Sequence, residues 1–154
     1  MLFENHYQLS YVTPDLALGA QILREKFDIA GFKQLGAAPV IENTVWTPDG
    51  DDVFIAMRAA IAFAGHLMIE LLEPVSGATE IFLEMLEPNQ PLKLHHLGIR
   101  CDDLEAVRAV HEQRGHPARM IGNFSTARFM YVDTRASLGH FLEYVAAPPE
   151  YWRR

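Results

Sequence analysis

Residues 94–105 read Leu-His-His-Leu-Gly-Ile-Arg-Cys-Asp-Asp-Leu-Glu, and this stretch decides the fold because it contains a transition from a strand to a helix. Its first part, residues 94–101, is rich in apolar side chains, which predicts a strand. Asp102 and Glu105 have the spacing of a capping box, so we expect a helix to begin here. Apolar residues then recur at helical spacing as far as Gly115, where the helix is expected to end.

The same plan occurs a first time near the start of the chain. Residues 6–13 predict a strand, and Pro14 follows at a position that suits the first turn of a helix. From Asp15 the apolar residues recur at steps of four, three and four, which predicts a helix that ends near Gly31. Asp15 and Asp103 are therefore equivalent points, 88 positions apart.

Short strands are expected after each helix. In the first half they are predicted at about residues 40–46, 52–64 and 65–73, with a turn at Thr47-Pro48-Asp49-Gly50 before the second. In the second half they are predicted at about residues 118–122, 127–133 and 139–146, with a turn at residues 135–139. The pattern predicts an α+β chain in which one βαβββ unit is written twice.

A linker separates the two halves. Thr79 is expected to cap a short helix within residues 77–90, and Pro88 ends that helix. One short module buries little apolar surface alone, so we expect residues 1–154 to form a single domain. Its parts are module one at about residues 5–74, module two at about residues 92–146 and a docked C-terminal tail at residues 147–154.

Composition excludes several classes of protein. Hydrophobic residues make up 49% and charged residues 21% of the chain, which is typical of globular proteins. Twenty acidic and 13 basic residues without a basic cluster argue against nucleic acid as a partner. We expect no membrane association, because no apolar run is long enough to span a bilayer, and no signal peptide is recognisable, so the expected location is the cytoplasm. Cys101 is the only cysteine, so a metal site would need histidine and carboxylate ligands.

Four polar side chains occupy matching places in otherwise apolar strands. Gln8 and His96 each lie seven positions before the aspartate that begins the following helix. Glu70 and Glu143 lie between large apolar residues in the last strand of each half, where a carboxylate is expected to be buried only if it is paired or bound to a metal. If the halves pack with pseudo-twofold symmetry, these four side chains converge as nitrogen and oxygen ligands for one divalent ion.

These motifs resemble the vicinal oxygen chelate superfamily, which includes glyoxalase I, methylmalonyl-CoA epimerase, extradiol dioxygenases and bleomycin-binding proteins. The resemblance covers about residues 5–146 and is carried by Tyr-Val-Thr-Pro-Asp-Leu (11–16), Ile-Glu-Leu-Leu-Glu-Pro (69–74), His-His-Leu-Gly-Ile-Arg-Cys-Asp-Asp-Leu (95–104) and His-Phe-Leu-Glu-Tyr-Val (140–145). It implies two βαβββ modules that form one curved half-barrel sheet system around a central site, and members are often homodimers. The family pattern assigns the metal ligands to Gln8, Glu70, His96 and Glu143.

The branch within this superfamily stays open. The ligand order Gln-Glu-His-Glu resembles one glyoxalase I pattern, whereas the segments around Glu73 and Arg135 look more like those of the epimerase branch. The two resemblances imply different substrates, so the sequence predicts only a small carbonyl compound or thioester.

Alternatives exist for each of the four residues. Gln8 shares a strand face with His6, which is a reserve ligand, and His66 shares a face with Glu70. Glu70 could instead pair with Arg58, and Glu143 with Arg100 or Arg128. His95 is predicted to point away from His96. His111 and His116 are expected to be exposed at a helix end, and Cys101 to be a small buried residue.

The predicted ligand set favours one kind of chemistry. A single histidine argues against the two-histidine, one-carboxylate site of Fe(II) oxygenases, so zinc, nickel, cobalt or manganese is expected rather than iron. Such an ion acts as a Lewis acid for an isomerase, epimerase or lyase that moves a proton next to a carbonyl. The glyoxalase I resemblance implies that Glu143 is the catalytic base, with Glu70 mainly a structural ligand.

Two other functions remain open at this point. One is an Fe(II) ring-cleaving dioxygenase, for which His6 or His66 would have to join His96 at the metal. The other is a non-enzymatic binding protein of the bleomycin-resistance type, which has no evident use for Glu70, His96 and Glu143.

Overall fold

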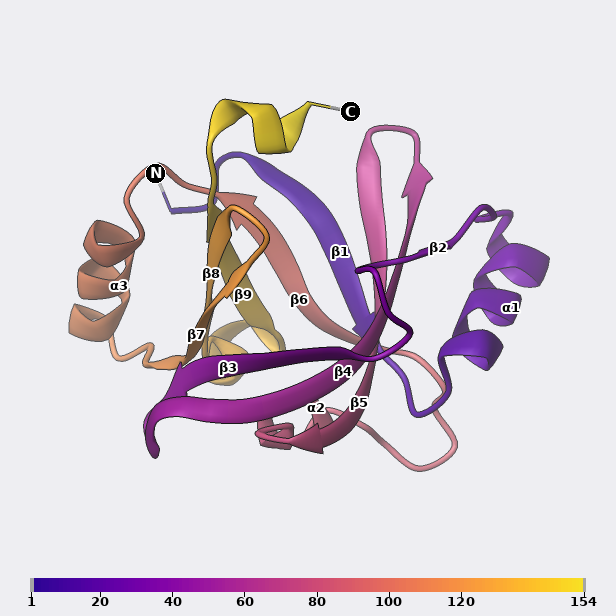
Figure 1. Ribbon diagram of the computed structural model, residues 1–154, viewed down its shortest axis with the longest axis horizontal. Coiled ribbons are helices and arrows are strands. Elements are labelled where there is room, and N and C mark those ends of the chain that lie inside the picture. The colour runs from indigo at the N-terminus through magenta and orange to yellow at the C-terminus, as the bar shows by residue number, and fades with distance from the viewer. Residues whose placement is uncertain (1, 154) are drawn as a thin grey trace. The chain divides into compact units, whose positions relative to one another are not determined.

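The computed structural model describes residues 2–153, which form strands and short helices (Figure 1). The strands are β1 (His6–Val12), β2 (Lys33–Gln34), β3 (Ile41–Thr47), β4 (Gly50–Ala64), β5 (Leu67–Gly77), β6 (Lys93–Arg100), β7 (Ala118–Phe124), β8 (Ala127–Val132) and β9 (Phe141–Ala146). The helices are α1 (Leu16–Phe27), α2 (Glu80–Leu83), α3 (Leu104–Gln113), α4 (Arg135–Leu138) and the 3₁₀ turn η1 (Pro149–Trp152).

The chain divides into two compact units. Unit 1 contains Met1–Tyr7, Thr44–Val53 and His96–Arg154. Unit 2 contains Gln8–Asn43 and Phe54–His95. Both units combine parallel and antiparallel strand pairs with helices, which confirms the α+β class. The pseudo-twofold symmetry, the half-barrel and the single domain stay predictions.

In unit 2 the first strand pairs with the last. Strand β1 runs parallel to β5, β5 is antiparallel to β4, and β4 is antiparallel to β2. The N-cap of α1 is Asp15, whose side chain accepts a hydrogen bond from the Leu18 amide, so Pro14 precedes the helix and does not lie in its first turn as the sequence predicted. The helix buries Leu23 against Ile69 and Leu71 of β5. Helix α1 therefore covers one face of the β1–β5 pair. The polar side chains of Gln8, Ser10 and Glu70 project from the other face.

Unit 1 repeats this connectivity with other strands. Strand β6 runs parallel to β9, β9 is antiparallel to β8, and β8 is antiparallel to β7. Strand β3 joins the β7 edge at Trp46. The core includes Leu104 of α3 together with Met130 and Leu142 of the sheet. Since alternate residues face opposite sides, the side chain of Glu143 lies on the face away from this core.

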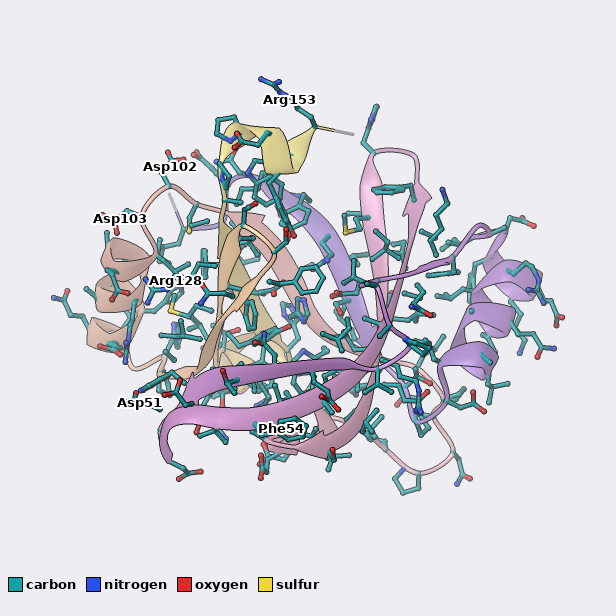
Figure 2. The ribbon with its side chains drawn as sticks, viewed as in Figure 1. Asp51, Phe54, Asp102, Asp103, Arg128 and Arg153 are labelled. Atoms are coloured by element: carbon teal, nitrogen blue, oxygen red, sulfur yellow. The ribbon has the colours of Figure 1, made fainter. Side chains whose placement is uncertain are left out.

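Helix α3 begins one residue later than the capping-box spacing predicts. The N-cap is Asp103, whose backbone is extended and whose side chain accepts a hydrogen bond from the Ala106 amide at 3.0 Å. Asp102 therefore does not cap the helix; both aspartates project at its start (Figure 2). An N-cap at Asp103 agrees with the sequence repeat, because Asp15, its equivalent in the first half, is the N-cap of α1.

Other local predictions also need correction. The turn expected at residues 135–139 is the helix α4, which Gly139 ends at a φ of 79°. Thr79 precedes α2, but its hydroxyl donates to the Gly77 carbonyl and does not cap the helix. Helix α1 ends at Phe27, before Gly31, because Asp28 adopts a left-handed conformation. The two-residue strand β2 was not predicted, since two residues carry no detectable alternation.

Among the described residues, none of the helices has both the length and the apolar character needed to cross a membrane.

Candidate functional site

Strand pairing in unit 1 brings two of the predicted site residues into contact. In the parallel β6–β9 pair, His96 stands opposite Phe141 and Gly98 opposite Glu143, so His96 and Glu143 share one face. The Nε2 atom of His96 lies 3.1 Å from an Oε2 atom of Glu143. His96 is fully buried and Glu143 is 8% exposed. This buried imidazole–carboxylate pair is the centre of the candidate site in unit 1.

Tyr131 of β8 is a further residue on the same face. It stands opposite Glu143 in the antiparallel β8–β9 pair and is buried. Its ring meets the ring of His96 edge to face, with 5.0 Å between the centroids. Sequence reasoning missed Tyr131, because nothing local in the chain distinguishes it from an ordinary aromatic core residue.

Unit 2 places Gln8 and Glu70 in the same register. In the parallel β1–β5 pair, Gln8 stands opposite Met68 and Ser10 opposite Glu70, so all four share one face. Gln8 and Glu70 are buried, and the Gln8 amide donates to the Met68 sulfur at 3.3 Å. Gln8 thus has the strand position in unit 2 that His96 has in unit 1, and Glu70 has that of Glu143.

The arginine pairs considered as alternatives do not form. Arg58 binds Glu73 at 2.7 Å rather than Glu70. Arg128 binds Glu105 at 3.0 Å rather than Glu143. Arg100, the other candidate partner of Glu143, packs against aromatic rings instead. The carboxylate of Glu143 therefore faces an imidazole and not a permanent cation.

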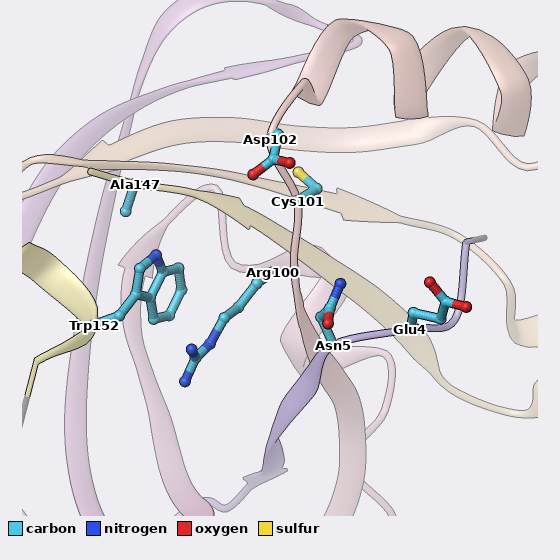
Figure 3. A pocket seen from close by; sticks show the side chains of 7 residues that line it. All are labelled: Glu4, Asn5, Arg100, Cys101, Asp102, Ala147 and Trp152. Carbon is cyan, nitrogen blue, oxygen red and sulfur yellow. The ribbon is translucent and has the colours of Figure 1, made fainter. Parts of the chain in front are cut away.

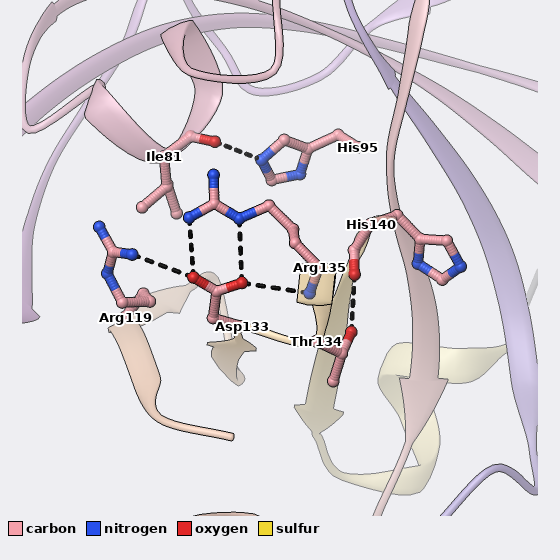
Figure 4. A network of polar contacts seen from close by, with 7 residues as sticks. All are labelled: Ile81, His95, Arg119, Asp133, Thr134, Arg135 and His140. Carbon is pink, nitrogen blue, oxygen red and sulfur yellow. Dashed lines mark hydrogen bonds and ion pairs between the residues drawn. The ribbon is translucent and has the colours of Figure 1, made fainter. Parts of the chain in front are cut away.

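The remaining histidines of the predicted set lie elsewhere. His6 is exposed, with its Nδ1 atom 3.4 Å from the Phe3 carbonyl oxygen. His66 is exposed in the turn before β5. In unit 2, His95 is buried, stacks on Phe82, and its Nε2 atom lies 3.0 Å from the Ile81 carbonyl oxygen (Figure 4). His95 therefore has a structural contact of its own.

The expectation that His111 is exposed is wrong. It is 3% exposed, and its Nε2 atom lies 2.8 Å from the hydroxyl of Tyr144. That hydroxyl donates to the Leu2 carbonyl, so His111 must donate through Nε2 and accept from Nδ1 of His116 at 3.1 Å. Burial, together with the neighbouring His116 and Arg114, lowers the pKa of His111 to about 4. His111 is therefore neutral at pH 7.

A second polar network in unit 1 orders the helix α4 and the start of β9. Asp133 accepts hydrogen bonds from Arg119 at 3.0 Å and from Arg135 at 2.8 and 2.9 Å (Figure 4). The hydrogen bonds from Arg135 hold the pKa of the Asp133 carboxyl below its ordinary value. Thr134 donates to the His140 carbonyl at 2.6 Å. These bonds fix where β9 starts, and hence where Glu143 lies.

The chemistry of the donor set fits a divalent ion. An imidazole nitrogen and a carboxylate oxygen are donors that zinc, nickel, cobalt and manganese accept. In unit 1 these two atoms of His96 and Glu143 lie 3.1 Å apart, which is a direct contact. Among residues 2–153, no three His, Cys, Asp or Glu side chains form a metal-binding group. The pair in unit 1 is thus a fitting half of a ligand set, to which Gln8 and Glu70 are the predicted complement.

Comparisons with known proteins agree with the fold. A family model described as the Glyoxalase/Bleomycin resistance protein/Dioxygenase superfamily matches residues 7–125. A comparison with curated proteins finds no match.

Several solved structures share the architecture. A methylmalonyl-CoA epimerase from Mycobacterium tuberculosis is 15% identical, with a TM-score of 0.60 over 97% of this chain and 92% of that chain. A Streptomyces coelicolor methylmalonyl-CoA epimerase variant in complex with 2-nitronate-propionyl-CoA is 17% identical, with a TM-score of 0.57 over 94% and 95%. A hypothetical protein from Bacillus halodurans C-125 is 15% identical, with a TM-score of 0.60 over 94% of both chains. At these identities the similarity establishes the fold alone.

Proposed function

Because the chain belongs to the Glyoxalase/Bleomycin resistance protein/Dioxygenase superfamily, we propose that it is a metal-dependent isomerase, epimerase or lyase that moves a proton next to a carbonyl group. The observation that carries this proposal is the buried contact between His96 and Glu143, with none of the arginines within residues 2–153 bound to the carboxylate. The matched register of Gln8 and Glu70 in unit 2 supports it.

The proposed ligands of the divalent ion are Gln8, Glu70, His96 and Glu143. When bound, the ion supplies Lewis-acid polarisation of the substrate carbonyl, which acidifies the adjacent carbon. Zinc, nickel, cobalt and manganese suit this mixture of nitrogen and oxygen donors. Tyr131 keeps the His96 ring in one orientation through their edge-to-face contact.

Glu143 is the proposed base. A carboxylate beside the bound substrate can accept a proton from the acidified carbon. His96 lies next to this carboxylate, with 3.1 Å between its Nε2 atom and Oε2 of Glu143. Glu70, in unit 2, is the ligand that secures the ion.

The proposed substrates are small acyl-CoA thioesters or 2-oxo compounds. The thioester class is supported by a relative of the same fold, a methylmalonyl-CoA epimerase solved with methylmalonyl-CoA and NH₄⁺. Both classes have a proton next to a carbonyl that a metal and a base can move.

The test is exchange of these protons with deuterated water, followed by mass spectrometry across a panel of both substrate classes. Protein purified without added metal should be analysed for its elements in parallel. Catalysed exchange with zinc, nickel, cobalt or manganese bound supports the proposal. Bound iron without exchange favours the ring-cleaving dioxygenase, and neither metal nor exchange favours the non-enzymatic binding protein.

A further inference from the structure

A pocket of about 390 Å³ lies in unit 1 at the carboxyl ends of β6 and β9 (Figure 3). It is lined by Arg100, Cys101 and Asp102 after β6, by Glu4 and Asn5 before β1, and by Ala147 and Trp152 after β9. Arg100 lies four residues beyond His96 on the same strand, which is about 13 Å along the chain. The pocket is therefore separate from the His96–Glu143 pair.

Arg100 is held by aromatic rings at one end of this pocket. Its guanidinium carbon lies 4.4 Å from the centroid of Trp152 and 5.5 Å from that of Tyr7. The two rings contact each other edge to face at 5.0 Å. Ring faces cover the flat side of a guanidinium, so a ligand can bind it only through the N–H groups at its edge.

The hydrogen-bonding capacity of Arg100 is incompletely used. Its Nε atom is buried and has no hydrogen-bond partner among the described residues. No carboxylate in the part of the chain that the structure describes forms an ion pair with it, in contrast to Arg58 and Arg128. Arg100 is half-buried and lines the pocket, so a carboxylate ligand can reach the accessible part of its guanidinium and supply the missing counter-charge.

The opposite end of the pocket is negative. Figure 3 shows the Asp102 carboxylate near the start of α3, and Glu4 is a second carboxylate that lines the pocket. Burial, with the carboxylates of Asp102 and Asp103, raises the pKa of the Cys101 thiol to about 11. The carboxylates of Asp102 and Asp103, which contribute to this shift after burial, would attract an ammonium group and repel a ligand with several negative charges.

We propose that this pocket binds a zwitterionic small molecule of the α-amino-acid class. The ligand carboxylate binds the edge of Arg100, the ammonium group faces Asp102, and the side chain occupies the remaining volume beside Trp152. A phosphate would meet the cation equally well but would place more negative charge against Asp102 and Glu4, which disfavours it.

Binding can be measured through the fluorescence of Trp152. The chain has two tryptophans, so a Trp46→Phe background leaves Trp152 as the reporter. The probes are L-leucine, its anionic analogue 4-methylpentanoate, its cationic analogue 3-methylbutylamine, and inorganic phosphate. L-leucine should give a saturable change, and each of the other three should bind at least about tenfold more weakly, because each lacks one charge-assisted contact or carries excess negative charge.

Variants assign the two contacts. Arg100→Lys should weaken L-leucine binding about tenfold, because an ammonium cannot reproduce the edge of a guanidinium. Asp102→Asn should remove the preference for L-leucine over 4-methylpentanoate, and since Asp102 is exposed this variant should fold normally. Arg128→Ala, which removes an arginine of the same unit paired with Glu105, should leave binding unchanged. Absence of saturation with L-leucine, tighter binding of phosphate, or equal binding by Arg100→Lys would overturn the proposal.

Discussion

Glu143 and Glu70 occupy the same strand position in their units, yet they are expected to respond differently to loss of charge. Glu143→Gln keeps a ligand oxygen and removes the ability to take a proton, so metal and fold should remain while proton exchange falls about 10²-fold or more. Glu70→Gln should first weaken metal affinity, with exchange partly recovered in excess ion. The measurements are the rate of proton exchange with deuterated water and the metal content of each variant.

The reverse pattern would reverse the assignment. If Glu143→Gln exchanges protons at the wild-type rate while Glu70→Gln loses exchange with the metal still bound, the base is Glu70.

The neighbouring histidines of β6 provide a matched pair. His96→Ala should lower metal occupancy, because His96 supplies the imidazole next to Glu143. His95→Ala should leave occupancy close to normal, because His95 lies on the opposite face against Phe82 and Ile81. Metal content after dialysis is the measurement, and equal losses in both variants would contradict the assignment of His96 as the ligand.

For single residues, the sequence predicts which polar side chains stand out in apolar strands but not which residues they contact. Glu143 and His96 are recognisable because a carboxylate and a repeat-matched histidine stand out in apolar strands. Their direct contact depends on the register between β6 and β9, which are separated by α3 and two strands. Local periodicity carries no information on that register, so Tyr131 and the free edge of Arg100 could not be found either.

Because α3 contains the buried His111, the free energy of unfolding should depend on pH. The pKa of His111 is about 4 in the folded chain, below its ordinary value of 6.5. The unfolded chain therefore binds the proton first, and the contribution of neutral His111 is complete above pH 6.5 and is lost as the pH falls toward 4. The loss should be of the order of 3 kcal/mol.

Urea unfolding between pH 4 and 8 measures this loss. His111→Gln should flatten the difference across that interval, because the glutamine does not titrate. His66→Gln, in an exposed turn of unit 2, should keep the wild-type slope. An unchanged slope in His111→Gln would show that other groups cause the acid sensitivity.

The start of α3 gives a second prediction at the level of the element. Asp103→Ala removes the hydrogen bond to the Ala106 amide and should lower the free energy of unfolding by about 1 kcal/mol. Asp102→Ala should change it by less than about 0.5 kcal/mol, because Asp102 does not cap the helix. Equal effects in chemical denaturation would favour the capping box predicted from the sequence.

Elements were predicted well where their signal is local. The strands β1 and β6 and the helical stripe that starts at Asp15 follow from the spacing of apolar residues within a few positions. The single-residue error at α3 arises because Asp102 and Asp103 are both good caps, and only the extended backbone at Asp103 decides between them. The burial of His111 depends on Tyr144 and Leu2, which lie far away in the chain.

At the scale of the whole molecule, metal binding is expected to couple to folding. Buried carboxylates such as Glu70 and Glu143 resist burial without a cation. Chelation should therefore lower the melting temperature, and added divalent ion should restore it in proportion to the logarithm of its free concentration. Identical thermal melting curves for metal-free and metal-loaded protein would count against the site.

The hydrogen bond from Tyr144 to the Leu2 carbonyl spans 142 positions and bears on how unit 1 reaches its native state. On the ribosome, the segment before β1 is made well before its partner strand β9, so unit 1 cannot close until β9 has been synthesised. Contacts of such long sequence separation slow folding, because a large loop must be ordered before they form. Nascent chains arrested before Phe141 should therefore leave the segment around Leu2 open to proteases, whereas full-length chains released from the ribosome should protect it.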